Sequence, residues 1–187
     1  MTLVSASESI LKAIEKRFET VGHPADITLV HSCGQSDRKD GIQHLAHEGL
    51  VKRIIGSHWG LQPRWMEMIA NSQVEAYCLP QGQIAQLYRS MACGLPGKMS
   101  KVGLGTFIDP RVEGGKMNDR TKPLPDIVDI LEYSGEEYMF YKEIPLDTVL
   151  IRGTVCDEMG NLTTTEEAMK LEVLPAVLAA KRYGGRV

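Results

Sequence analysis

"QVEAYCLPQGQIAQLYRSMACG", residues 73–94, places a strand directly before a helix. The run 73–80 is apolar, and Pro80 ends it because proline lacks the N–H that a strand ladder needs. The run 82–92 has the periodicity of an amphipathic helix. Its apolar face consists of Ile84, Leu87, Tyr88 and Met91. A strand that passes at once into a helix is the repeating unit of α/β folds.

The same unit recurs towards the N-terminus. A helix capped by Ser5 or Ser7 and ended by Gly22 and Pro24 opens the chain. After it we expect alternating elements: strand 25–32, helix 42–51, strand 51–59 and helix 63–71. Strands joined by crossover helices predict a three-layer α/β fold, with a largely parallel sheet and helices on both faces.

The second half of the chain has a different pattern. Residues 112–125 are polar and rich in glycine and proline, which predicts an exposed, mobile loop. Residues 126–161 contain three β-rich runs, and we expect the last strand, 148–154, to enter the main sheet. A helix over 166–185, stopped by the glycine pair at its end, is predicted last.

Composition bounds the class of protein. The chain has 187 residues, which suits one well-buried domain, and a formal net charge of −3. Without a dense Lys/Arg cluster, neither nucleic acid nor an anionic membrane is an expected partner. No apolar run reaches the ~20 residues of a membrane helix, and the charged N-terminus does not read as a signal peptide, so we expect a cytoplasmic location.

Two phosphate-binding motifs are absent. A phosphate loop of the GxxxxGK[ST] type would need glycine at Ala92 and a hydroxyl residue at Met99. The stretch 103–108, "GLGTFI", has Ile108 where a dinucleotide-binding fingerprint has its third glycine. A turn remains the simpler interpretation of these glycines.

Metal and disulfide chemistry is not expected either. His44 and His47 have no third ligand at metal-binding spacing, so we predict solvated or packed histidines and no metal site. The four cysteines are widely spaced, and we expect reduced, mostly buried thiols. They are Cys33, Cys78, Cys93 and Cys156.

The strand-end loops are where a ligand is expected, because parallel sheets bind ligands at the carboxyl ends of their strands. Gly82, at the start of a helix, and Gly103 and Gly105, in a glycine-rich turn, leave backbone N–H groups accessible. Gln81 can donate a hydrogen bond to a carboxylate or thioester oxygen. The residues alone therefore indicate an α/β domain that binds an anionic or charge-developing group.

Several segments together resemble family I coenzyme A transferases of the acetate/propionate type. Residues 77–118 contain the "PQG" before a helix and the glycine-rich stretch that leads to "TFIDPR". Residues 149–168 contain Arg-Gly-Thr, Asp-x-x-Gly-Asn and a following helix. The segments 31–37 and 53–60 fit the strand-end loops between them. The resemblance covers nearly the whole chain, which looks like the first half of such a protein.

The resemblance implies that coenzyme A is moved from a short-chain acyl-CoA to a carboxylic acid through a glutamyl-CoA thioester. The acyl-CoA is a substrate, and no bound cofactor is implied. Nine residues are expected to line the substrate pocket, the last three with less direct support. They are Gln81, Gly82, Gly103, Gly105, Thr106, Phe107, Ser32, Cys33 and His58.

The family's nucleophilic glutamate lies in a Glu-Asn-Gly motif of the second half, and this sequence has no such motif. We therefore expect 1–187 to be an incomplete N-terminal, alpha-type domain that is inactive alone and contains no catalytic residue. Its expected partners are a glutamate-bearing second half or beta-type subunit and further copies of itself. The alternative is a non-catalytic ligand-binding or regulatory domain of the same fold.

Overall fold

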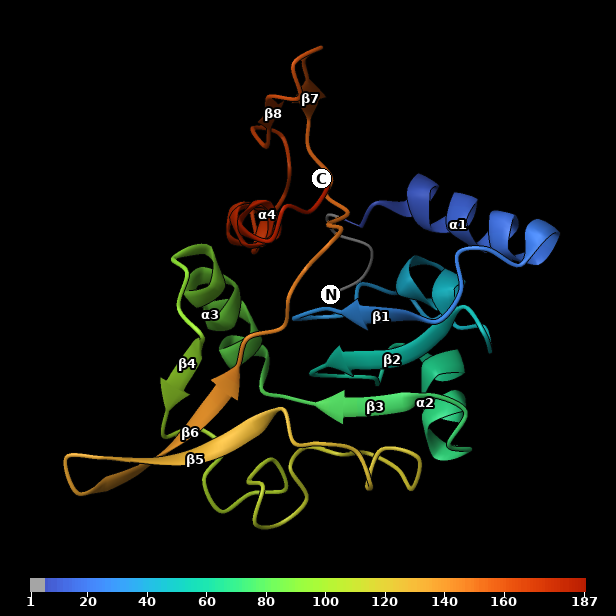
Figure 1. Cartoon of the computed structure of the whole chain (residues 1–187). Helices are drawn as coiled ribbons and strands as arrows, with labels where there is room; N and C mark the ends of the chain where they lie inside the picture. Colours follow the sequence, from blue (N-terminus) through green and yellow to red (C-terminus); the bar gives the residue numbers. More distant parts are fainter. Residues whose placement is uncertain (1–5) are drawn as a thin grey trace.

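The structure is a computed structural model that describes residues 6–187 (Figure 1). The helices of this part are α1 (Glu8–Val21), the 3₁₀ helix η1 (Gly41–Leu45), α2 (Pro63–Ala70), α3 (Gln81–Ala92) and α4 (Val173–Arg182). The strands are β1 (Ile27–Val30), β2 (Val51–Gly56), β3 (Glu75–Cys78), β4 (Gly97–Ser100), β5 (Val128–Tyr133), β6 (Glu136–Lys142), β7 (Val155–Cys156) and β8 (Leu162–Thr163).

A parallel sheet of order β1-β2-β3 organises the first half of the chain. Its central strand β2 is buried at Ile54 and Ile55, as expected for a strand with neighbours on both sides. Helix α2 begins at Pro63, which suits the first helical position. The core of this half includes Leu11, Leu50, Trp65, Met68 and Ile69. The predicted α/β fold class is confirmed.

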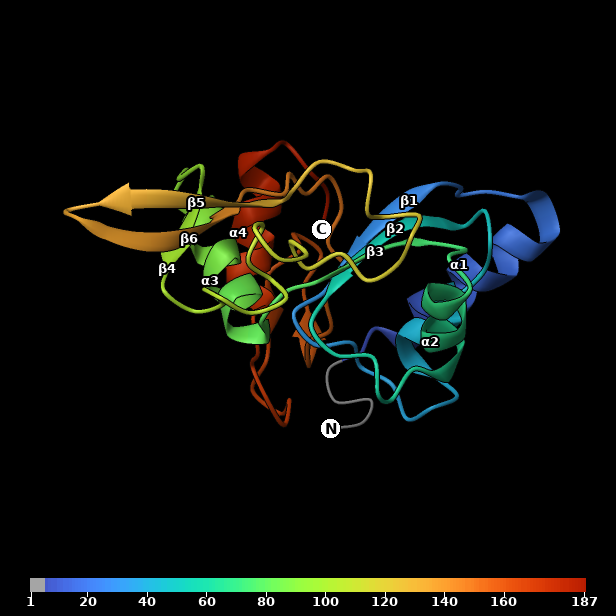
Figure 2. The same ribbon diagram turned by 90° about the horizontal axis from the view of Figure 1, so that it is seen from below.

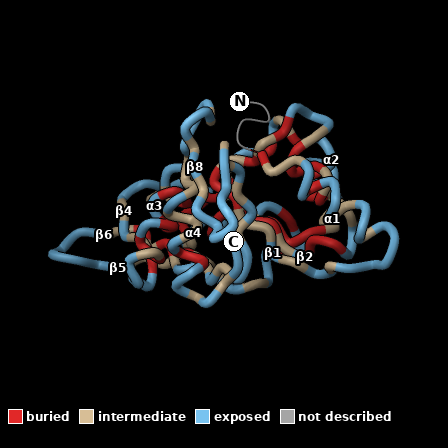
Figure 3. Tube along the Cα trace, turned by 90° about the horizontal axis from the view of Figure 1, so that it is seen from above, coloured by how far each residue is buried: buried red, intermediate tan, exposed pale blue. Residues whose placement is uncertain are grey.

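The remaining strands form two antiparallel sheets, of order β4-β6-β5 and β7-β8. The hairpin of β5 and β6 confirms the predicted local pairing, and its tip projects from the body as an exposed segment (Figure 3). The predicted strand 148–154 is wrong. Its first residues pair with Arg186 instead of the main sheet, because the Val149 N–H donates to the Arg186 carbonyl and the Arg186 N–H to the Asp147 carbonyl.

Helices α3 and α4 lie beyond the carboxyl ends of β1, β2 and β3 in both ribbon views (Figure 1, Figure 2). The apolar face predicted for α3 is buried at all four positions. The two helices pack against each other through Leu87 and Met91 on α3 and Ala179 on α4. Their C-terminal ends coincide, since the Arg182 side chain lies beside Gly94. The helices therefore run in the same direction and begin near the strand ends.

Helix α4 begins seven residues later than the predicted helix 166–185. Leu171 has a φ of 44°, in the left-handed region that a right-handed helix cannot continue through, and Glu172 occupies the N-cap position. Pro175 is the third helical residue, where its missing N–H leaves no hydrogen bond unmade. The predicted glycine stop is confirmed, because Gly184 has a φ of 71° and its N–H donates to the Lys181 carbonyl.

The segment 112–125 is exposed over most of its residues, as its composition predicts, but it is anchored at buried positions. Asn118 is buried, and its amide donates to the carbonyls of Ile69 and Val74, both at 2.9 Å. The Thr121 hydroxyl oxygen accepts the Ala76 N–H at 2.8 Å. Side-chain hydrogen bonds to β3 and its approach thus satisfy backbone groups that water would otherwise bind. Mobility of the whole segment stays a prediction.

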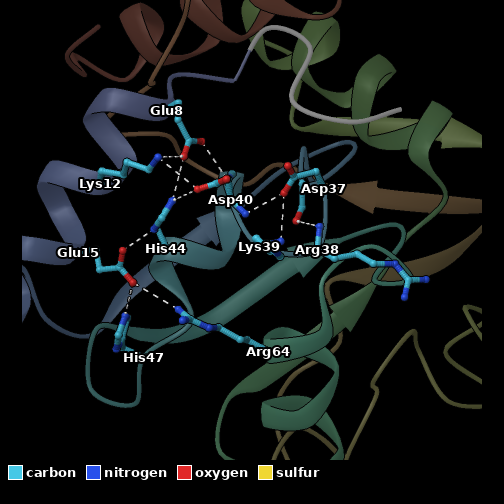
Figure 4. Close-up of polar contacts among 12 residues, drawn as sticks. Glu8, Lys12, Glu15, Asp37, Arg38, Lys39, Asp40, His44, His47 and Arg64 are labelled. Carbon is cyan, nitrogen blue, oxygen red and sulfur yellow. Dashed lines mark hydrogen bonds and ion pairs between the residues drawn. The ribbon is translucent and has the colours of Figure 1, made fainter.

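A cluster of ion pairs fastens α1 to η1 (Figure 4). The His44 ring contacts Glu15 through Nδ1, and its Nε2 lies 2.9 Å from Glu8 and 3.2 Å from Asp40. Glu15 also contacts His47 and Arg64. The two histidines are therefore packed, as predicted, but with charged partners that their local sequence did not indicate.

Three smaller predictions have mixed outcomes. Ser7 occupies the N-cap position of α1 without a side-chain hydrogen bond, and Ser5 lies outside the described residues. All four cysteines are free, but Cys33 and Cys78 are half-buried and Cys93 and Cys156 are exposed, so the prediction of mostly buried thiols is wrong. No helix within residues 6–187 is long and apolar enough to cross a membrane.

Candidate functional site

The carboxyl ends of the three parallel strands are joined by a chain of polar contacts. Ser32 follows β1 and is 8% exposed, and its carbonyl accepts the Ser57 hydroxyl from the end of β2 at 2.5 Å. The Ser57 carbonyl in turn lies 3.4 Å from the Cys78 sulfur at the end of β3. We call these linked strand ends the platform; Cys78, at the end of β3, lies three positions before Gln81, where α3 begins.

Gln81 and Gly82 open α3 beside that platform, and both are exposed. Pro80 holds the N-cap position in an extended conformation, which turns the chain directly from the strand into the helix. The first N–H groups of a helix have no intrahelical acceptor and carry its positive dipole end. A Cβ at Gly82 would meet nothing within 4 Å, so a ligand has room to approach the backbone there.

The glycine-rich turn is held in shape by one buried carboxylate. Asp109 is 1% exposed and accepts the Gly105 N–H at 2.9 Å. Arg111 donates to the same carboxylate and holds its pKa well below the usual range. Gly103 and Gly105 have φ values of 100° and 69°, which only glycine adopts without strain.

The other turn residues differ in exposure. The Thr106 hydroxyl donates to the Gly103 carbonyl at 2.7 Å, so it serves the turn itself. The Phe107 side chain is 42% exposed, and its backbone carbonyl accepts the Gly115 N–H. The Gly115 carbonyl also accepts the Cys78 N–H at 2.7 Å. The turn and Gln81 are thus both attached to the end of β3, and no hydrogen bond joins them directly in residues 6–187.

Two predicted residues lie at the strand ends without contacting Gln81 by any hydrogen bond in the described part of the chain. Cys33 follows Ser32 and is half-buried, and burial raises the pKa of its thiol. His58 is exposed, and its Nδ1 accepts the Gly60 N–H at 2.8 Å, which makes it a turn residue. The structure therefore places both at the expected edge and assigns neither a ligand.

Two residues of this edge escaped the sequence analysis. The Ser32 hydroxyl donates to Glu172 at 3.0 Å, a contact between residues 140 positions apart. His31 is buried with both ring nitrogens unpartnered, it meets the edge of Trp59, and burial lowers its pKa to about 4. No local pattern announces either contact, since Glu172 was expected inside a helix and His31 inside a strand.

Two other features of the described residues could be taken for a site, a hollow and a cluster of possible metal ligands. A hollow of about 370 Å³ lies at the C-terminal ends of α3 and α4, away from the strand edge; it is lined by Gly94, Pro96, Glu143, Arg182 and Tyr183.

Glu8, Asp40 and His44 bring possible metal-ligand atoms within 4.8 Å of one another. The Lys12 ammonium lies 3.1 Å from Glu8 and 3.2 Å from Asp40, so a lysine already occupies the position of a cation.

Comparisons with known proteins bear on the family of this chain. Caffeate CoA-transferase from Acetobacterium woodii is 41% identical over all of this chain and 36% of its own length. The solved structure of acyl-CoA transferase YdiF from Escherichia coli O157:H7, described as a thioester complex with CoA, matches with a TM-score of 0.93 and 35% identity. That match covers 97% of this chain and 35% of the other.

A less similar relative is named as an alpha subunit. The alpha subunit of acetoacetyl-CoA:acetate/butyrate CoA transferase from Clostridium acetobutylicum is 31% identical over 65% of this chain and 48% of its own length. The chain spans about a third of the length of the first two proteins that it matches. The profile of the coenzyme A transferase family matches residues 8–183. The chain belongs to the coenzyme A transferase family.

Proposed function

We propose that this chain forms the acyl- and carboxylate-binding part of an enzyme that moves coenzyme A between a short-chain acyl-CoA and a carboxylic acid. The proposal rests on family membership together with one observation, the position of Gln81. Gln81 is the first residue of α3, at the positive end of the helix, and follows the last residue of β3 by three positions. A carbonyl oxygen that gains negative charge would be stabilised at that point.

The reaction divides one difficult exchange into easier steps. A glutamate carboxylate attacks the thioester, which releases the CoA thiolate and forms an acyl–glutamyl anhydride. The thiolate then attacks the glutamyl carbonyl and releases the first carboxylic acid, which leaves a glutamyl-CoA thioester. A second carboxylate takes the acyl position and the exchange runs in reverse. We propose that the glutamate comes from a second half or a beta-type subunit, since this sequence has no Glu-Asn-Gly motif.

The role of this chain is then to bind and orient. Gln81 donates to the developing oxyanion, Gly82 admits the thioester to the helix terminus, and the turn of Gly103–Phe107 forms one wall. Ser32, Cys33 and His58 line the part of the pocket that holds the acyl group. We further propose a cytoplasmic enzyme that assembles from several copies.

Gln81→Ala in a complex reconstituted with a glutamate-bearing second half tests the proposal. Loss of a hydrogen bond to a charge-developing oxygen costs about 1.5–3 kcal/mol, so the rate of CoA transfer should fall roughly ten- to a hundred-fold. Gln86→Ala is the control, because Gln86 is an exposed glutamine on the same helix. The measurement is exchange of CoA between acetyl-CoA and a short carboxylate.

The same experiment separates the enzyme from the alternative, a ligand-binding or regulatory domain. Without the second half the chain should show no exchange above background. A glutamyl-CoA thioester trapped on this chain alone would contradict the assignment of the nucleophile. Binding of acyl-CoA without exchange, even in the reconstituted complex, would favour the regulatory domain.

A further inference from the structure

Glu172 is the one carboxylate that the described structure places against the strand-edge platform by a side-chain hydrogen bond. It lies at the N-cap of α4 and accepts the Ser32 hydroxyl at 3.0 Å. Because α3 and α4 run in the same direction, this end of α4 faces the same edge as the first turn of α3. Glu172 thus stands at the β1 side of the platform, and Gln81 at the β3 side.

Within residues 6–187, no lysine or arginine side chain forms an ion pair with Glu172. Ser32 is its side-chain partner in this part of the chain. After burial, the negative charge of Glu172 is a cause of the raised pKa of the Tyr88 hydroxyl. Burial also raises the pKa of the Cys33 thiol, the positive charge of the N-terminus opposes that change, and Glu172 adds to it. A carboxylate without an ion-pair partner among these residues, in a partly buried site, repels other anions.

The spacing of the strands determines which part of a bound acid lies near Glu172. β1 and β3 flank β2, so their ends lie two inter-strand spacings apart, about 10 Å. An acid whose reacting carboxylate is held at Gln81 extends its far end along the strand edges, towards Ser32 and Glu172. A far end with no charge is tolerated there, whereas a second carboxylate meets a like charge.

We propose that Glu172 is a specificity-determining residue that excludes acids with a second negative charge and selects monocarboxylic acids. This inference rests on the proposed function, because it takes the strand edge as the acid-binding site. The Ser32 hydroxyl fixes the carboxylate in place, and the charge itself discriminates between substrates.

The local field is measured on this chain without any turnover. Iodoacetate and iodoacetamide alkylate the same thiolate, so the ratio of their rates at Cys33 reports the local potential, whatever the pKa of the thiol. Glu172→Gln should raise the iodoacetate-to-iodoacetamide rate ratio at Cys33 about five-fold over the wild type. High salt should reduce this difference between the variant and the wild type. The exposed Cys93 serves as internal reference, and Glu132→Gln, an exposed glutamate on β5, as control variant.

Specificity is measured on the complex with its glutamate-bearing second half, with butyrate and succinate as four-carbon acceptors. Glu172→Gln should raise kcat/KM for succinate relative to butyrate about ten-fold, while Glu172→Asp keeps the wild-type ratio and Glu132→Gln changes neither value. An unchanged acceptor ratio, an unchanged alkylation ratio, or a Cys33 that reacts with neither reagent overturns the assignment of Glu172. A wild-type complex that transfers CoA to neither acid overturns the proposed function instead.

Discussion

Asp109 controls the shape of the glycine-rich turn through a single carboxylate. One oxygen accepts the Gly105 N–H and the Arg111 Nη2, and the other accepts the Arg111 backbone N–H and Nε. Asp109→Asn keeps the size of the side chain but removes its charge and one acceptor. We expect it to lower the free energy of unfolding at pH 7 by about 1–3 kcal/mol in urea titrations.

The pH dependence of this contribution follows from the sign of the shift. The folded-state pKa of Asp109 is lowered, chiefly by Arg111, so its stabilisation is complete above the ordinary pKa of 3.8 and is lost as the pH falls below that value. Asp119→Asn is the control, because the Asp119 side chain is 85% exposed. Equal losses in the two variants would contradict the special position of Asp109.

Gly103 and Gly105 both have positive φ but differ in the space around them. A Cβ at Gly103 would lie 2.7 Å from the Tyr141 hydroxyl, which donates to the Val102 carbonyl. A Cβ at Gly105 would meet nothing within 4 Å. Gly105→Ala should therefore cost about 1 kcal/mol of backbone strain, and Gly103→Ala clearly more. Thermal unfolding of both variants checks the order, and a larger loss for Gly105→Ala would contradict it.

At the scale of elements, the attachment of α1 to η1 should depend on pH. Burial disfavours the charged form of His44, but the hydrogen bonds that its ring donates to Glu15 and Glu8 outweigh this effect and raise its pKa above the ordinary 6.5. A raised folded-state pKa means that the stabilisation is complete below pH 6.5 and is lost as the pH rises through the higher value. Asp40 and Glu15 have lowered pKa values, so their share is lost in acid.

His44→Gln should consequently destabilise the protein by about 0.5–1 kcal/mol more at pH 6 than at pH 8.5. Urea unfolding at the two pH values measures this difference. His58→Gln is the matched control, since its ring is exposed and its recorded partner is the Gly60 backbone. The same pH dependence in both variants would show that the cluster contributes nothing specific.

The sequence predicted those elements whose conformation depends on neighbouring residues in the chain. The strand before Pro80, the helix from Gln81 and the helix from Pro63 lie where periodicity and proline placed them. The helix 166–185 failed at its start because a left-handed Leu171 overrides good helix formers. The strand 148–154 failed because a strand needs a neighbouring backbone, which only the tertiary structure supplies.

The same distinction holds for the site. Gln81 and the glycine turn carry local signals, a proline before a helix and glycines at φ values that other residues avoid. The contact between Ser32 and Glu172 and the partners of His44 join positions far apart in the chain. A single sequence does not encode such pairs in any readable pattern, so the charge at the strand edge became visible only in three dimensions.

At the scale of the whole molecule we expect self-association. The outer face of α4 carries two exposed leucines one helical turn apart, Leu174 at 66% and Leu178 at 49% exposure, and proteins usually cover such pairs. Sedimentation should show dimers or larger species, and Leu174→Glu should shift the distribution towards monomer. Met159→Glu, at an 88% exposed position near the β7–β8 hairpin, is the control. A wild type that stays monomeric at high concentration would contradict the expectation.

The contact between Ser32 and Glu172 also constrains the order in which the protein is made. During synthesis the strands β1, β2 and β3 leave the ribosome long before α4 does, so the carboxyl end of β1 at first lacks the contact between Ser32 and Glu172. Closure over so long a stretch of chain is slow compared with the pairing of neighbouring strands. In a chain paused before residue 172, the Ser32 hydroxyl would lack its Glu172 partner, and only completion of α4 would supply that carboxylate.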